Sequence, residues 1–468
     1  MYTLPKGELT NKTFSKAMDH AIAIELTTIP CYLSTYYSIN RAQDQDALYN
    51  KILIQVQDEK IAKELTLDVL VYANKAAALI MSVVVEEMLH LSLSSNVKQA
   101  GVAPPDLMKA GKNLTYPTSL FGNPNEFKIN RAPLSIDQLI SFLKIESPNR
   151  FKGDHNDTIG EFYDKIIKYI KNSKIDWRLT DNGYPQLVPT QPYYAQNTIN
   201  TVYYDRKHNP QFPSADDSGG MVEVKDKGSA ITALNEIIEQ GEGHKGGDQL
   251  EIINGKPKPL PIKDGKVVFS PEDYDDPAEE ELSHFAKFME LYTLGDHYEE
   301  KFSKHTGLDN FFSYFVYDQA VNPVTDEYSN VLYQQSQLAN AIYTYILLMI
   351  ETCYHQELPT QYEVFMMGIH KSMIWLLSQF GRDVNQQTFA KKTGGAIKNY
   401  AGSVTFEYYP FEDQKEVRPK EQIIKLAQKL IEMDSSYGWL FTDPQYLLAL
   451  PDVGLDHQVN KTPLHTSK

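Results

Sequence analysis

Two short segments of the chain carry the same pair of metal-ligating residue types at the same spacing. Glu87 and His90 form one Glu-x-x-His motif, and Glu281 and His284 form the other. Residues three apart lie about 60° apart around a helix, so each pair points from one helix face. Carboxylate and imidazole groups are common ligands of iron, manganese and related divalent ions. The two motifs therefore predict a metal site built by two helices.

Both pairs fall on helix faces that are otherwise mostly apolar. The first shares its face with Ile80, Val83, Ser94 and Val97, and the second with Phe285, Phe288, Leu291 and Tyr292. A buried carboxylate is costly unless it is paired, neutralised or bound to a metal. One such pair has an ordinary explanation in a protonated glutamate or a satisfied core histidine. Two pairs favour a di-metal carboxylate four-helix bundle, in which two further helices each supply a glutamate.

The pattern thus predicts two more buried glutamates. Glu25 lies in the centre of an apolar stripe and is the best candidate of the first helix. A later helix offers Glu239 and Glu242. Glu242 lies nearer the apolar face, whereas Glu239 is followed by one more turn before the glycines at 241 and 243. Both glutamates remain candidates, one as a metal ligand and the other as a supporting group. The alternative for all the candidate ligands together is a bundle with a polar core and no metal.

Tyr32 follows Glu25 by seven residues and therefore lies on the same helix face. We expect it to act as a candidate catalytic residue, either by hydrogen bonding near the metals or by donating an electron. The alternative is a packed aromatic residue with a satisfied hydroxyl group. Pro30, one turn after Glu25, removes one backbone hydrogen bond and is expected to kink this helix.

The periodicity of apolar residues predicts a mostly α protein. The four metal-bearing helices are expected at 13–38, 74–100, 229–242 and 278–294. A further helix is expected at about 46–72, two shorter ones at 134–146 and 158–171, and C-terminal helices at 327–353, 359–380 and 419–433. Residues 101–228 would form a long crossover, and its Tyr-rich part at 193–204 is a candidate wall of the substrate pocket. Residues 243–277 would form a hairpin-like excursion around two Gly turns.

Composition narrows the possible partners. The chain has 468 residues, with 45 Lys and Arg against 61 Asp and Glu, a formal charge of −16. This acidic balance argues against a nucleic-acid footprint and against an anionic membrane surface. With 42% hydrophobic residues the chain can build a large core. Cys31 and Cys353 suggest no disulfide framework, and with no signal-peptide pattern at residues 1–13 we expect a cytoplasmic protein.

Several motifs in the same order resemble one protein family. They are residues 23–33 (AIELTTIPCYL), 86–90 (EEMLH), 116–117 (YP), 132–134 (APL), 158–163 (TIGEFY), 238–243 (IEQGEG), 281–284 (ELSH) and 321–323 (VNP). The chain resembles the ferritin-like domain of the iminophenyl-pyruvate dimer synthase family, which includes the large violacein- and rebeccamycin-pathway enzymes that couple two oxidised tryptophan units. The similarity extends from about Lys16 to Phe411.

The resemblance implies a ferritin-like four-helix bundle with a non-haem metal centre. By position it carries ligand roles to Glu25, Glu87, His90, Glu239 or Glu242, Glu281 and His284. Two departures matter. The chain is about half the length of the pathway enzymes and is expected to be a stand-alone version, and residues 44–72 add a helical segment between the first two ligand helices. The exact coupling reaction is therefore not transferred.

We accordingly expect residues 1–300 to form the di-metal bundle with its crossover insertion 101–228, and 301–468 to form a helical C-terminal extension packed on it. The expected function is that of a non-haem di-iron or Mn/Fe oxidase or oxygenase. It would use O₂ or peroxide on a small amine, amino acid or imino acid in specialised metabolism, and a homo-oligomer is possible. The alternatives are oxidative coupling of two imino acids, a metal-binding or storage protein without an organic substrate, and a structural protein that uses the bundle for assembly.

Overall fold

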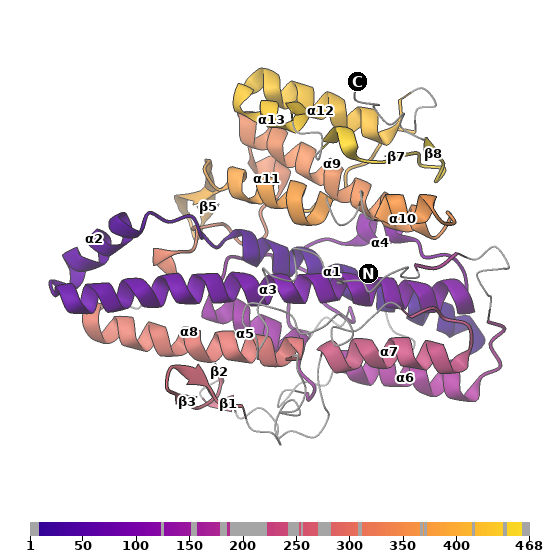
Figure 1. The fold of residues 1–468 in the computed structure, drawn as a ribbon, viewed down its shortest axis with the longest axis horizontal. Helices are drawn as coiled ribbons and strands as arrows, with labels where there is room; N and C mark the ends of the chain where they lie inside the picture. The colour runs from indigo at the N-terminus through magenta and orange to yellow at the C-terminus, as the bar shows by residue number, and fades with distance from the viewer. Residues whose placement is uncertain are drawn as a thin grey trace.

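A long central helix organises the computed structural model of this protein. The structure describes residues 9–122, 126–150, 157–177, 185–187, 222–241, 252–253, 256–269, 282–307, 311–365, 368, 372–413, 417–442 and 447–460. Helix α3 spans Glu59–Gly101, and α1 (Asn11–Tyr37) packs along it more extensively than any other helix. On the side of α3 away from the C-terminal helices, α8 (His284–Thr306) and α7 (Lys227–Gly241) follow one another along its length (Figure 1).

Two shorter helices complete the bundle. Helix α5 (Ile136–Ile145) packs against α8, and α6 (Ile159–Asn172) packs against α7. The Thr158 and Glu161 side chains form a capping box at the start of α6, which fixes where this helix begins. The fold class predicted from the sequence, a mostly α bundle of the ferritin-like type, is confirmed. The Tyr-rich segment 193–204 lies outside the described residues.

The first long helix forms where the sequence predicts it. Thr10 caps α1 through a capping box with Thr13, and the helix continues through Pro30 to Tyr37. Cys31 and Cys353 are buried and unbonded to each other, as expected of packing residues. The apolar part of α3 is long enough to cross a membrane, but 94% of that window is buried inside the protein, as in the core helix of a bundle.

The second predicted helix is wrong in its end point. We expected a helix over 46–72 and a break before 74, whereas the chain forms α2 (Gln45–Val56) and then starts α3 at Glu59. Gln57 adopts the left-handed conformation at φ 53°, and the Asp58 side chain caps α3 by accepting from the backbone of Lys60 and Ile61. The break therefore lies at a capping aspartate, and α3 is one helix of 43 residues.

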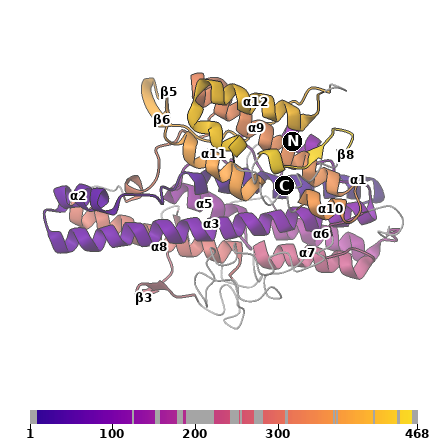
Figure 2. The same ribbon diagram turned by 45° about the horizontal axis from the view of Figure 1, so that its top comes forward.

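A second layer of helices covers α1 and α3. Its main elements are α9 (Asn330–Cys353), α10 (Thr360–Val364), α11 (Leu377–Val384), α12 (Pro419–Met433) and α13 (Trp439–Thr442), and α4 (Leu107–Asn113) joins α9 to the bundle. The layer lies above the bundle in Figure 1 and comes forward when the view is turned (Figure 2). One helix was expected at 359–380. The described residues there instead form α10, a π-helical turn at 372–376 and α11.

Strands are short and peripheral. Within the part of the chain that the structure describes, they form four two-stranded antiparallel ladders: β1 (Ile252–Ile253) with β2 (Lys256–Pro257), β3 (Ile262–Lys263) with β4 (Lys266–Val267), β5 (Thr388–Thr393) with β6 (Ala396–Ala401), and β7 (Asp452–Val453) with β8 (Val459–Asn460). The first two ladders confirm the hairpin-like character of the excursion.

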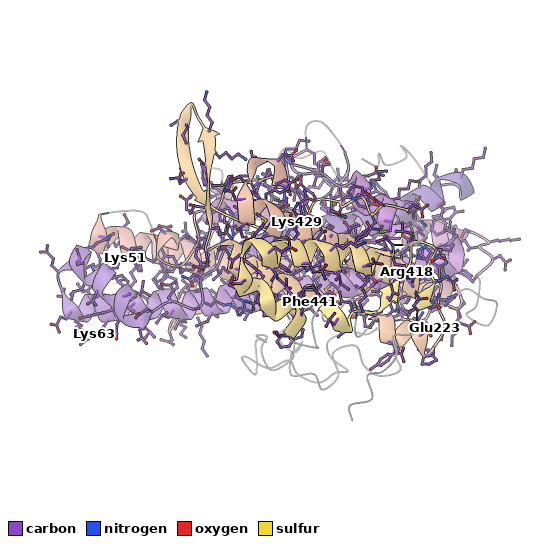
Figure 3. All side chains as sticks on the ribbon, turned by 90° about the horizontal axis from the view of Figure 1, so that it is seen from above. Lys51, Lys63, Glu223, Arg418, Lys429 and Phe441 are labelled. Atoms are coloured by element: carbon purple, nitrogen blue, oxygen red, sulfur yellow. The ribbon has the colours of Figure 1, made fainter. Side chains whose placement is uncertain are left out.

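Seen from above, the C-terminal layer with Lys429 and Phe441 covers the middle of the molecule, and the end with Lys51 and Lys63 extends beyond it (Figure 3).

Candidate metal centre

The centre lies where α7 ends and α8 begins. His284 is the first residue of α8, and Ser283 caps the helix by accepting a hydrogen bond from the backbone of Ala286. We expected this helix to start near 278, but Leu282 and Ser283 lie outside it, and Ser283 has an extended conformation. The turn into α8 places the His284 ring inside the bundle with no exposed surface.

Helix α3 brings two of the predicted ligands to the same place. Glu87 and His90 are both buried, and Glu87 Oε1 lies 2.9 Å from His284 Nδ1 and 3.9 Å from His90 Nδ1. The two imidazole rings face each other with centroids 5.1 Å apart. One ligand atom from each of Glu87, His90 and His284 can be chosen so that all three lie within 4.8 Å of one another. Glu87 thus stands between the two histidines.

Glu25 reaches the centre from α1, as predicted. Its Oε2 lies 3.7 Å from His90 Nδ1, and its Oε1 accepts a hydrogen bond from the Tyr163 hydroxyl group of α6. Thr28, one turn later on α1, donates to Glu87 Oε2 at 2.5 Å. The first helix therefore supplies one carboxylate and holds a second one in place.

Sequence reasoning missed Glu146, which follows the last residue of α5. Its Oε2 lies 3.6 Å from His284 Nδ1, and its Oε1 accepts a hydrogen bond from Tyr32. One signal was present in the sequence. An acidic residue at the C-terminal end of a helix faces the negative end of the helix dipole, so its charge needs another partner. Tyr32 is fully buried beside Phe142 and Phe288, with its hydroxyl group on Glu146.

The remaining predicted ligands are not brought into this cluster by the described structure. Glu239 is exposed on α7, because the apolar face of α7 turns Ala233, Leu234 and Ile237 inward instead. Its neighbour Gln240 faces the centre and lies 3.0 Å from His90 Nε2. Glu242 and Glu281 lie outside the described residues, so their assignment stays a prediction.

The three central carboxylates share one arrangement. Glu25, Glu87 and Glu146 each use one oxygen to accept a hydrogen bond from a hydroxyl group, of Tyr163, Thr28 and Tyr32 respectively. The other oxygen of each points toward an imidazole Nδ1 atom. Three carboxylate oxygens and two imidazole nitrogens therefore converge on one small volume.

Burial and mutual repulsion perturb these groups strongly. Burial, reinforced by the neighbouring carboxylates Glu87 and Glu146, raises the pKa of Glu25 well above its ordinary range, and burial likewise raises the pKa of Glu87. Burial beside His284 lowers the pKa of His90 to about 3. Burial also opposes a charge on His284, but contacts with Glu146, Glu86 and Glu87 outweigh it and raise the pKa of this imidazole. Without a metal the cluster must therefore hold protons that a cation would replace.

The residues present fit a divalent metal ion. Neither ring nitrogen of His284 makes a hydrogen bond of good geometry with any described residue, although carboxylate oxygens lie 2.9 Å from both. Buried polar atoms are normally satisfied, so the unaligned Nδ1 atom of His284, which faces oxygens of both Glu87 and Glu146, indicates a missing common partner. Carboxylate oxygen and imidazole nitrogen are suitable ligands for iron and manganese, and Glu87, His90 and His284 would be able to hold such an ion together.

Comparison with known proteins supports the same class of fold. Residues 18–293 match the family model described as Ferritin-like, which covers more than half of the chain, so the chain belongs to the ferritin-like family. A solved structure of a ferritin-like protein from Caulobacter vibrioides is similar, with 17% identity over 79% of this chain and 97% of that chain and a TM-score of 0.35. No curated protein matches the chain. The ferritin-like superfamily includes both di-iron oxygenases and storage proteins.

Proposed function

We propose that this protein is a non-haem di-iron or Mn/Fe oxidase or oxygenase that acts on a small amine, amino acid or imino acid. One observation carries the proposal: the buried cluster of Glu25, Glu87, His90, Glu146 and His284, whose free oxygen and nitrogen atoms converge. Two divalent ions held there would supply the activation of O₂ or peroxide. The positive charge of such ions would offset the negative charge of the three buried carboxylates in the cluster.

The chain's own residues give the centre its protection and geometry. Tyr32, Thr28 and Tyr163 hold the outer oxygen of each carboxylate, so that the inner oxygen stays directed at the centre. Phe142 and Phe288 pack against the Tyr32 ring and exclude water from that side. Burial of this degree suits a redox centre, because it keeps a reactive group away from solvent.

The fourth bundle carboxylate is proposed to be Glu242 rather than Glu239. Glu239 is exposed, whereas a side chain built on Gly241 would place its Cβ 3.6 Å from Glu146 Oε2, so the end of α7 reaches the centre. Glu281 is proposed as a further ligand on the strength of its Glu-x-x-His motif alone. Neither assignment affects the five residues above.

A finer form of the proposal follows from the resemblance to the iminophenyl-pyruvate dimer synthase family. In that form two imino acids are joined by a new carbon–carbon bond. Two electrons and two protons leave the pair of substrates, and O₂ is reduced to hydrogen peroxide or peroxide to water. The motifs at 23–33, 86–90 and 281–284 support this form. A small-molecule substrate, rather than a nucleic acid or a membrane, is the proposed partner, and the cytoplasm the proposed compartment.

The experiment starts from metal-free protein loaded anaerobically with Fe(II) and then exposed to O₂ in the presence of candidate amino acids and imino acids. The proposal predicts oxygen consumption coupled to an oxidised organic product, and loss of both in Glu87→Ala. Oxidation of many added iron atoms per chain into a mineral core, without organic product, would instead support a storage protein. Fewer than about one metal per chain, unchanged by Glu87→Ala, would leave only a structural bundle.

A further inference from the structure

The two histidines of the centre are held from behind by chemically different groups. His284 Nε2 lies 2.9 Å from Glu86 Oε2, and both oxygens of Glu86 lie 2.7 Å from the Lys287 ammonium group. His90 Nε2 lies 3.0 Å from Gln240 Oε1 instead. One histidine therefore faces a charged carboxylate and the other a neutral amide.

The orientation of the Gln240 amide is fixed by its neighbours. Its nitrogen donates to Glu236 Oε1 at 3.1 Å, one helical turn earlier on α7, which leaves the amide oxygen toward His90. His90 then carries its proton on Nε2, and the lone pair of Nδ1 faces Glu25 and Glu87. In the same way, His284 Nε2 lies 2.9 Å from Glu86 Oε2, and His284 Nδ1 faces Glu87 and Glu146. Both histidines thus present Nδ1 to the centre, with outer partners of different charge.

We propose that these outer partners make the two metal positions unequal, so that the position at His284 binds more tightly and fills first. The inference rests on the proposed function and adds an order of assembly to it. Glu86, Lys287 and Gln240 are the positioning residues that set this order. None of them lies among the three convergent carboxylates.

The electrostatic reason is the basicity of the ligand nitrogen. A carboxylate behind an imidazole orients the ring and strengthens its nitrogen as a ligand, and losing such a partner typically lowers metal affinity about 10- to 100-fold. A neutral amide orients the ring but adds less electron density. Behind His284, the Glu86 carboxylate forms an ion pair with the ammonium group of Lys287, and both side chains are almost fully buried.

The spacing of the inner atoms supports the same order. Around His284 Nδ1, Glu87 Oε1 is at 2.9 Å and Glu146 Oε2 at 3.6 Å. Around His90 Nδ1, Glu25 Oε2 is at 3.7 Å and Glu87 Oε1 at 3.9 Å. The donors near His284 are therefore already closer to its Nδ1 atom than the donors near His90 are to theirs. Gln240 is only half-buried and is the last residue but one of α7, so the support of His90 is less rigid.

The test is an anaerobic titration of the metal-free full chain with Co²⁺, followed by calorimetry and by ligand-field absorption. We expect two binding steps whose affinities differ at least about tenfold. His90→Ala should remove the weaker step and keep one tight Co²⁺ ion, and His284→Ala should remove the tighter step. Two equal steps, or loss of the tight step in His90→Ala, would overturn the order.

The charge argument is tested by a neutral replacement. The double variant Glu86→Gln/Lys287→Met removes both charges and should weaken the first step by about 10- to 100-fold while the second changes little. Glu239→Gln, an exposed residue next to Gln240, is the matched control and should change neither step. Equal weakening of both steps in the double variant contradicts the inference. Absence of any Co²⁺ binding in a wild-type chain of normal helicity contradicts the proposed function itself.

Discussion

Lys287 on α8 forms a buried ion pair with Glu86 on α3. Its ammonium group contacts both oxygens of Glu86 at 2.7 Å, and the two side chains are each 2% exposed. We consider the variant Lys287→Met, which keeps most of the volume of the side chain and removes its charge. Glu86 then stays buried beside His284 without the ammonium group.

The magnitude follows from the geometry. Two unit charges 2.7 Å apart attract by about 6 kcal/mol at an effective dielectric constant of about 20, before desolvation is subtracted. Removing one partner of a buried pair leaves an uncompensated charge and costs about 3–5 kcal/mol. We therefore expect the free energy of unfolding of the metal-free protein to fall by that amount.

Urea denaturation followed by circular dichroism measures this loss, and two further variants control it. Lys75→Met breaks the Lys75–Glu290 pair between the same two helices, but Lys75 reaches solvent, so we expect a loss of about 1 kcal/mol. Glu86→Gln/Lys287→Met should recover most of the stability, because no buried charge is left alone. The reasoning is refuted if Lys287→Met costs no more than Lys75→Met, or if the double variant is no more stable than the single one.

Three other perturbations give distinct outcomes. Glu146→Gln should lower the bound metal by at least half, as measured by elemental analysis, whereas Glu239→Gln should leave it unchanged. Tyr32→Phe should keep the metal but slow product formation about tenfold or more, since Glu146 loses its hydroxyl partner; an unchanged rate would reduce Tyr32 to a packing residue. Burial lowers the pKa of His20 from 6.5 to about 4, so stability present above the unfolded pKa is lost as pH falls through that window. The free energy of unfolding should be lower at pH 5 than at pH 7, and this decrease should be about 2 kcal/mol larger in wild type than in His20→Leu.

Helical periodicity predicted the part of the centre that lies within helices. Glu25, Glu87 and His90 sit mid-helix, where the spacing of apolar neighbours alone fixes the buried face. The structure brings these three together with His284 as expected. The assignment of metal to them stays a prediction until an ion is observed.

Positions at helix ends were harder to predict. Glu146 enters the centre only because α5 packs against α8, which depends on tertiary structure rather than on local spacing. The sequence leaves both Glu239 and Glu242 open as the ligand near Gly241, and the face that α7 buries puts Glu239 in solvent. The missed start of α3 has a local cause, since Asp58 is a capping residue that a long apolar pattern concealed.

The proposed function requires that the cluster of Glu25, Glu87, His90, Glu146 and His284 holds two metal ions. The most direct measurement is anomalous X-ray diffraction at the iron edge from crystals of protein loaded anaerobically with Fe(II). We predict two peaks, one among Glu25, Glu87 and His90 and one among Glu87, Glu146 and His284. A loaded crystal with no peak in this cluster, and with its carboxylates hydrogen-bonded to one another instead, would contradict the account.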